Sequence, residues 1–226
     1  MLRGLNERFP LAGWILTAGA LHTNPGFFAL ACEELQAHAV LTVKGNQPGL
    51  YAVLNGLCWA GARTHRTRDK GHGRSETRSH LVMDAPEEIK ERFPHVRQVA
   101  RVIRTRTVTW WKGDGKTRRR VTETSTETVY LITSLTAREA GPEHIAAYIR
   151  NHWGIENKVH YVRDVTLCED ASKVSAGSLP RAFATLRNLL MGLIRQAGYE
   201  DVAATIRNAE YDNDLIFALL RLTTAP

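Results

Sequence analysis

The stretch GWILTAGALHTNPGFFALACEELQAHAVLTV, residues 13–43, decides the fold class of this chain. Residues 13–23 are apolar and end in small and polar side chains, which indicates a short buried strand. Asn24-Pro25-Gly26 breaks that strand, and from Phe27 to His38 the apolar residues follow helical spacing. Residues 39–43 are a compact second strand. The order strand, helix, strand predicts an α/β fold with a parallel strand pair.

The turn that follows, Lys44-Gly-Asn-Gln-Pro48, is polar and contains glycine. Open α/β sheets tend to place their binding sites at the carboxyl ends of strands, so Lys44 is a candidate binding residue. The structural alternative is a turn stabilised by the Asn46 and Gln47 side chains, and it stays open. A short helix is expected over residues 50–59.

Residues 61–135 alternate Arg or Thr with Val, Ile and Trp, as in Val99-Ala-Arg-Val-Ile-Arg-Thr-Arg-Thr-Val-Thr-Trp-Trp111. Such alternation is typical of half-buried antiparallel strands, and Gly113-Asp-Gly-Lys is a plausible hairpin turn. A sheet with one basic, threonine-rich face could lie against a phosphate backbone, but the same pattern describes any solvated β face. The Trp110-Trp111 pair is expected to pack in a core or on a sheet face rather than to stack on bases.

Gly141-Pro142-Glu143 marks the start of a helix that carries Tyr148-Ile-Arg-Asn-His-Trp-Gly-Ile-Glu-Asn-Lys-Val-His-Tyr-Val-Arg163. At 100° per residue, four polar side chains share one face of this helix: Tyr148, His152, Glu156 and Arg163. The ordinary meaning of mixed charges on a helix is a solvated face with a salt bridge. A functional site is the alternative, and residues alone do not decide between them.

The rest of the chain is expected to be helical. An acidic loop carries Asp164, Glu169 and Asp170, which are expected to be solvated. A helix then begins at Ser178, runs through Leu186 and Leu189 to Gly198, and is expected to lie mostly in the core. Two short packing helices follow it.

Composition narrows the class of partner. A net charge of +7 over 226 residues favours a polyanion such as DNA, and the basic residues crowd two segments, 63–78 and 101–120. No apolar run reaches the roughly 20 residues that span a bilayer, and no secretory signal is present, so a cytoplasmic protein is expected. The three cysteines lack disulfide or zinc spacing, and His65, His72 and His80 are expected to be surface residues or phosphate contacts.

Several motifs, taken together and in order, resemble the DDE transposases of bacterial insertion sequences, and within them the ISAs-type, H-repeat-associated branch. They are Leu16-Thr-Ala-Gly-Ala-Leu-His-Thr23, Leu41-Thr-Val-Lys-Gly-Asn-Gln-Pro48, Asp69-Lys-Gly-His-Gly-Arg74, Tyr130-Leu-Ile-Thr-Ser-Leu135 and His152-Trp-Gly-Ile-Glu-Asn157 followed by Arg163-Asp-Val. The resemblance implies an α/β fold with an N-terminally truncated ribonuclease H-like core. Residues 1–60 would be the second half of its sheet, 61–140 a β-rich basic insertion, and 141–226 the helix with the last catalytic acid and the C-terminal helices.

The resemblance also implies an activity. These transposases bind the ends of their element, cleave DNA and transfer strands with Mg²⁺ or Mn²⁺, and a homodimer is expected. Three carboxylates hold two divalent ions in such a site, because hard cations prefer oxygen ligands. Glu156 would be the third carboxylate and a metal ligand. The expected DNA-binding residues are Lys44, Arg74, Arg104, Arg106, His152 and Arg163.

Two departures from the family pattern bear on catalysis. Thr17-Ala18-Gly19 stands where relatives read Thr-Ala-Asp, so the second acid is absent. The first acid would lie on a strand upstream of Met1, which leaves Glu156 alone of the three. A single carboxylate cannot hold a pair of metal ions. The chain is therefore expected to be a truncated, inactive transposase; the alternative is a catalytically dead remnant that acts only as a DNA-binding protein.

Overall fold

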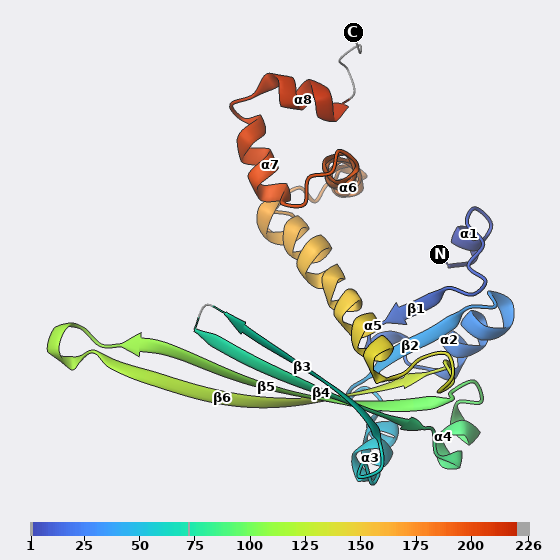
Figure 1. Ribbon diagram of the computed structural model, residues 1–226. Coiled ribbons are helices and arrows are strands. Elements are labelled where there is room, and N and C mark those ends of the chain that lie inside the picture. Colours follow the sequence, from blue (N-terminus) through green and yellow to red (C-terminus); the bar gives the residue numbers. More distant parts are fainter. Residues whose placement is uncertain (1, 72, 221–226) are drawn as a thin grey trace. The chain divides into compact units, whose positions relative to one another are not determined.

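The computed structural model describes residues 2–71 and 73–220, without the side chains of Lys116, Glu156 and Asn157 (Figure 1). The chain forms two compact units, Met1–His152 and Trp153–Pro226. Within the described ranges, no helix is long and apolar enough to cross a membrane.

The first unit is built on a six-stranded sheet with the order β1-β2-β6-β5-β4-β3. Its strands are β1 (Ile15–Ala18), β2 (His38–Val43), β3 (Arg63–Gly71), β4 (Arg74–Asp84), β5 (Gln98–Lys112) and β6 (Arg119–Thr133). Strands β1 and β2 are parallel, as the sequence predicts, and every other neighbouring pair is antiparallel. The α/β fold class is confirmed, and the arrangement is compatible with a ribonuclease H-like transposase fold.

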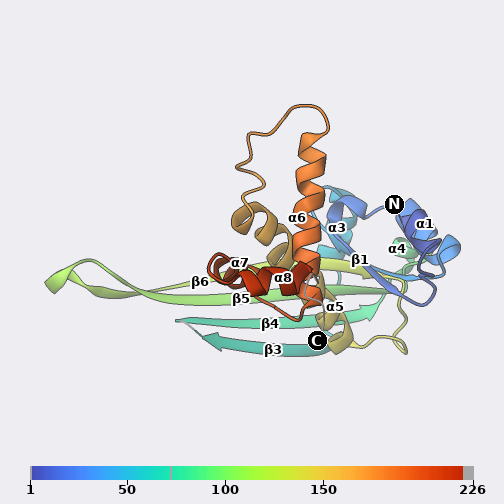
Figure 2. The ribbon, with the colours of Figure 1, turned by 90° about the horizontal axis from the view of Figure 1, so that it is seen from above.

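The expected β insertion continues the sheet of the parallel pair, because β6 pairs with β2 on one side and with β5 on the other. Figure 2 shows β6, β5, β4 and β3 side by side. The β4–β5 register ends at Arg74↔Val108, so the tip of the β5–β6 hairpin is two-stranded. The hairpin is confirmed, although its loop is longer than a tight turn and contains a 3-10 helix, Gly115–Thr117. The boundaries proposed at residues 60 and 140 stay predictions.

The helix predicted over residues 27–38 begins earlier and ends earlier. It is α2 (Pro25–Ala29), which runs into a π-helical segment, Leu30–Glu34. The Asn24 side chain accepts a hydrogen bond of 2.9 Å from the Phe27 backbone N–H, and the fixed φ of Pro25 suits the first helical position. The unit also contains α1 (Leu2–Asn6), a 3-10 helix (Ala20–His22), α3 (Pro48–Gly56), α4 (Glu87–Arg92) and most of α5 (Pro142–Ile155).

Two apolar cores lie on opposite faces of the sheet. On one face, Phe28, Leu50, Leu54 and Ile89 of the helices pack on inward-facing strand residues such as Tyr130. On the other face, Ile145 and Ala146 of α5 pack on β-strand residues that include Val40 and Leu131. Figure 1 shows α3 and α4 on one side of the sheet and α5 on the other. Both cores extend across the sheet to β4 and β5 at the end of these strands that carries Val82 and Ala100, so the other end of strands β3 to β6 projects beyond them.

The second unit is helical. Its helices are α6 (Leu179–Gln196), α7 (Val202–Ala209) and α8 (Asn213–Leu220), preceded by two π-helical segments, Glu156–His160 and Val162–Thr166. A small core joins Ile194, Val202 and Leu219. The expectation that α6 lies mostly in the core is wrong, because Leu186 and Leu189 are 58% and 56% exposed. Helical spacing identifies an apolar face, but it does not show that another element covers that face.

Candidate nucleic-acid interface

The carboxyl ends of the parallel strands are joined by side-chain hydrogen bonds to backbone carbonyls. Asn46 Nδ2 donates to the Ala20 carbonyl at 2.7 Å, and Gln47 Nε2 donates to the Thr23 carbonyl at 2.8 Å. The prediction that the Asn46 and Gln47 side chains stabilise this turn is therefore confirmed. Lys44 is exposed just after β2, and its side chain forms no hydrogen bond or ion pair with another described residue, although its carbonyl accepts a hydrogen bond from the Gln47 N–H. Its role in binding stays a prediction.

His152, the last residue of the first unit, lies next to β1. Its Nδ1 is 3.1 Å from the Thr17 hydroxyl, and both side chains are partly buried. Tyr148, one turn earlier on α5, packs against the apolar core on that face of the sheet. Two members of the predicted polar quartet are thus held by contacts with the sheet rather than fully solvated. The proposed phosphate contact of His152 stays a prediction.

Of the other two members of the quartet, Arg163 does not follow the predicted geometry. The 100° step holds only as far as Ile155, because the backbone from Glu156 to His160 and from Val162 to Thr166 is π-helical. A π-helix has more residues per turn, so the angle calculated for Arg163 is wrong. The side chain of Glu156 lies outside the described residues, and its catalytic and metal-binding roles stay predictions.

Arg163 is paired with a residue of the acidic loop. Its Nε donates to Glu169 Oε2 at 2.6 Å, and its Nη2 contacts Glu169 Oε1. This hydrogen-bonded pair holds the pKa of the Glu169 carboxyl below its usual range. The expectation that Glu169 is a solvated loop residue is wrong, since only 22% of its side chain is exposed. Loop position alone does not reveal such a pairing.

The end of β1 does not fit a pair of divalent cations. Gly19, which follows the strand, brings no side-chain oxygen, and the next three residues form a 3-10 helix of Ala20, Leu21 and His22. In the part of the chain that the structure describes, no group of three or more His, Cys, Asp or Glu side chains could hold a metal ion. The side chains at this strand end suit hydrogen bonding rather than metal coordination.

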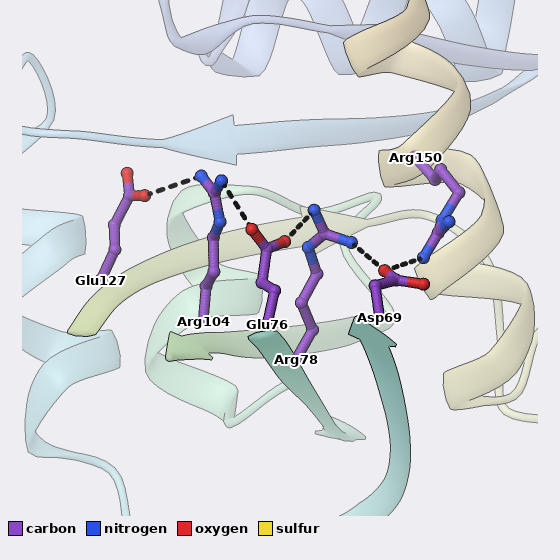
Figure 3. A network of polar contacts seen from close by, with 6 residues as sticks. All are labelled: Asp69, Glu76, Arg78, Arg104, Glu127 and Arg150. Atoms are coloured by element: carbon purple, nitrogen blue, oxygen red, sulfur yellow. Dashed lines mark hydrogen bonds and ion pairs between the residues drawn. The ribbon is translucent and has the colours of Figure 1, made fainter. Parts of the chain in front are cut away.

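The part of strands β3 to β6 from the cross-strand row Thr67–Arg78–Arg104–Glu127 to the hairpin tip is here called the arm. It carries a chain of alternating charges on the face that also packs against α5 (Figure 3). Glu76, which is 2% exposed, lies at its centre. Arg104 Nη2 donates to Glu76 Oε2 at 2.9 Å, and Arg78 pairs with Glu76 Oε1. Weaker pairs extend the chain at both ends, with distances of 3.6 Å for Arg104–Glu127 and 3.3 Å for Arg78–Asp69 and Arg150–Asp69.

The electrostatics of Glu76 follow from its position. Burial alone would raise the pKa of this carboxyl, but the Arg104 hydrogen bond and the charges of Arg78, Arg104 and Arg74 outweigh it, so the pKa lies below its usual range. His80 is buried on the same face, and burial lowers its pKa. The expectation of a surface position is therefore wrong for His80. His72 lies outside the described residues.

The opposite face of the arm is lined with hydroxyl groups. Thr105, Thr107 and Thr109 of β5 stand opposite Thr126, Thr124 and Thr122 of β6, with hydroxyl–hydroxyl distances of 3.5, 3.0 and 3.1 Å. Across β4, the register continues to Arg68 and Lys70 of β3, which are exposed. This surface is called the threonine face, and the opposite one the ion-pair face.

The structure has a basic, threonine-rich face, but Arg104 and Arg106 of β5 are not part of it. Arg104 and Arg106 lie on the ion-pair face, while Thr105 and Thr107 lie on the threonine face, because successive side chains of a strand point to opposite sides. Arg74 begins β4, where it is exposed. The DNA contacts expected of these three arginines stay predictions.

Sequence reasoning misjudged or missed several residues of the arm. Trp110 and Trp111 are 39% and 59% exposed, so the core half of the expectation is wrong, while a position on a sheet face agrees with their place on β5. Arg118 lies 5.1 Å from the centre of the Trp111 ring. Glu76 received no role, although a single acid among alternating basic residues of one strand is a signal that could have been read. Arg68 and Lys70 were likewise not assigned to a face.

No protein-family model matches the chain. The chain is 27% identical over 176 residues, 72% of its length, to "Putative transposase YncI" of Escherichia coli O157:H7. It is also 27% identical over 130 residues, 56% of its length, to "H repeat-associated putative transposase YhhI" of Escherichia coli strain K12. The matches cover 41% and 31% of these relatives, so the chain spans less than half of their length. It is thus similar to proteins that are named as transposases.

Proposed function

We propose that this chain is part of an insertion-sequence transposase of the DDE type, and that acting alone it binds DNA without cleaving it. The observation that carries the proposal is the 27% identity to a protein named as a transposase over 72% of the chain. The strand–helix–strand start of the sheet and the motifs around Glu156 support the same assignment. The proposed partner is the DNA at the ends of the element, bound by a homodimer.

Net charge supports DNA as the partner. The chain carries 30 Lys and Arg against 23 Asp and Glu, and many of the basic side chains lie on the arm. Basic residues that neutralise phosphates release condensed counterions, so the affinity for DNA should fall steeply as salt rises. This salt dependence is what distinguishes phosphate binding from an apolar association.

The chain alone is not expected to cleave DNA, because Gly19 lacks the carboxylate that a second metal-binding acid would provide at this position. In the complete transposase, bound Mg²⁺ or Mn²⁺ would activate the attacking oxygen and stabilise the leaving one. Glu156 is the proposed catalytic carboxylate and metal ligand of this site. Gly19 supplies no second carboxylate, and a metal pair needs oxygen ligands from several elements. A catalytically dead remnant that acts only by binding DNA is the second candidate, and the same residue favours it.

A cleavage and binding experiment tests the proposal. The substrate is duplex DNA from the genomic sequence that flanks the gene, incubated with the protein and Mg²⁺ or Mn²⁺. We expect a salt-sensitive shift of the DNA in a gel and no nicked product. Nicking that disappears in Glu156→Gln would overturn the statement that the chain does not cleave. Absence of any salt-sensitive shift would overturn the DNA-binding function.

A further inference from the structure

The two faces of the arm differ sharply in charge. On the ion-pair face, the cross-strand rows from Gly71–Arg74 to Thr67–Arg78 place four arginines among four carboxylates: Arg74, Arg78, Arg104, Arg106, Asp69, Glu76, Glu123 and Glu127. Cations and anions therefore alternate there, and the strongest pairs are buried around Glu76. A surface with balanced charge attracts a polyanion weakly.

The threonine face has no acidic side chain along any of its described strand positions. Its basic residues are Arg68, Lys70 and Arg120, with Arg66 and Arg101 on the same side of the sheet before the arm begins, and their neighbours are mostly Ser and Thr. Arg66 is engaged with the Ser79 hydroxyl at 3.3 Å. Among the described residues, the side chains of Arg68 and Lys70 take part in no hydrogen bond or ion pair, and both are exposed. These two cations are available to a ligand.

The hydroxyl pairs add donors to this positive surface. Each Thr hydroxyl has one proton, so in a pair such as Thr107–Thr124 one hydroxyl donates to the other and the second proton remains free. Thr122, Thr124 and Thr126 are exposed. Side-chain hydroxyls, Lys and Arg are the groups that supply most protein contacts to the sugar–phosphate backbone of DNA.

We infer that the backbone of duplex DNA lies along the threonine face, with Arg68 and Lys70 on phosphates and the β6 threonine hydroxyls donating to phosphate oxygens. The inference rests on the proposed DNA binding and adds the surface that performs it. It also places Arg104 and Arg106 away from the DNA, since they lie on the ion-pair face. The contacts are to the backbone, so binding through this face is independent of base sequence.

The test compares two variants that lose the same charge from opposite faces. Arg68→Gln/Lys70→Gln removes two charges from the threonine face. Lys112→Gln/Arg119→Gln removes two charges from the ion-pair face, near the hairpin tip. All four side chains are exposed, and equal circular dichroism spectra and melting curves establish that both variants fold. Binding of a fluorescently labelled duplex is measured by anisotropy over a range of salt concentrations.

The salt slope is the decisive quantity. Each phosphate contact contributes about 0.9 to the slope of log affinity against log salt, so Arg68→Gln/Lys70→Gln should reduce the slope by about 1.8. Between 50 and 200 mM salt the wild type should then lose roughly tenfold more affinity than this variant. Lys112→Gln/Arg119→Gln should keep the wild-type slope. Thr124→Val/Thr126→Val should weaken binding without changing the slope, because it removes donors and no charge.

The outcomes separate the inference from the function on which it rests. Wild-type binding with an unchanged slope in Arg68→Gln/Lys70→Gln would overturn the inference and leave DNA binding intact. An equal loss in both charge variants would also overturn it, because binding would then follow total charge and not the face. If the wild type shows no salt-dependent binding, the proposed function fails and the inference fails with it.

Discussion

Replacing Glu76 by Gln should destabilise the first unit by about 3 kcal/mol at pH 7. Removing one partner of a buried ion pair costs about 3–5 kcal/mol, because the remaining charge is left without compensation. Here two arginines, Arg78 and Arg104, lose their shared carboxylate while only 20% and 19% of their side chains are exposed. Asp69 still pairs with Arg78, and Glu127 still pairs with Arg104. The loss of stability is therefore expected at the lower end of the range of about 3–5 kcal/mol.

Unfolding in urea, followed by circular dichroism, measures this free energy. The matched control is Glu127→Gln, which removes a carboxylate from the same arginine, Arg104, but from a side chain that is 64% exposed. Exposed ion pairs contribute about 0–1 kcal/mol, so the control should lose less than about 1 kcal/mol. Equal stability losses in the two variants would show that burial of Glu76 does not control the strength of the network.

The pH dependence gives a second check on the same residue. The pKa of Glu76 in the folded protein is lowered, so its stabilising contribution is present above the ordinary carboxyl pKa of about 4.3 and is lost as pH falls through the lower folded value. The difference between wild type and Glu76→Gln should therefore shrink below about pH 4. A difference that stays constant from pH 7 to pH 3 would refute the reasoning, because a protonated Glu76 resembles the amide.

Two further predictions concern single contacts. Arg163→Gln should raise the pKa of Glu169 towards its usual value of about 4.3, because the bound guanidinium of Arg163 lowers that pKa. An NMR titration of the Glu169 carboxyl carbon measures this pKa. An unchanged pKa would contradict the pairing. Thr17→Val should cost about 1 kcal/mol through loss of the hydrogen bond with His152, and should lower the melting temperature by a few degrees. Thr42→Val, another partly buried threonine of the parallel pair, whose side chain makes no such hydrogen bond with a described residue, is its control.

The strand–helix–strand start could be predicted because its signals are local. The apolar run before Gly19, the Asn24-Pro25 break and helical spacing after it each act within a few residues, and the parallel pairing of β1 and β2 follows from their connection by a helix. The β5–β6 hairpin was predictable for the same reason, since alternation and a glycine-containing turn specify it. The π-helical segments were not, because no short-range residue preference marks them. The start of α2 was missed although the Asn24 cap and Pro25 mark it.

The candidate site could be predicted only in part. Lys44, His152 and Glu156 were singled out by their positions in motifs, and Gly19 could be read as a missing acid. The pairing of Arg163 with Glu169 was missed, because the loop that brings the two together has no periodicity. The exposure of Trp111 was also missed, since strand alternation does not show how far a hairpin extends beyond its neighbours.

The sequence by itself determined the α/β order, the basic charge and the alternation of Arg and Thr along β5. That alternation already separates the two faces of the strand, because side chains of a strand repeat with a period of two. Only the tertiary structure decided which strands lie side by side, and pairing across strands depends on long-range register. It brings Glu76 of β4 between Arg78 and Arg104, and the described strand positions on the opposite face of the arm carry cations and hydroxyls but no carboxylate.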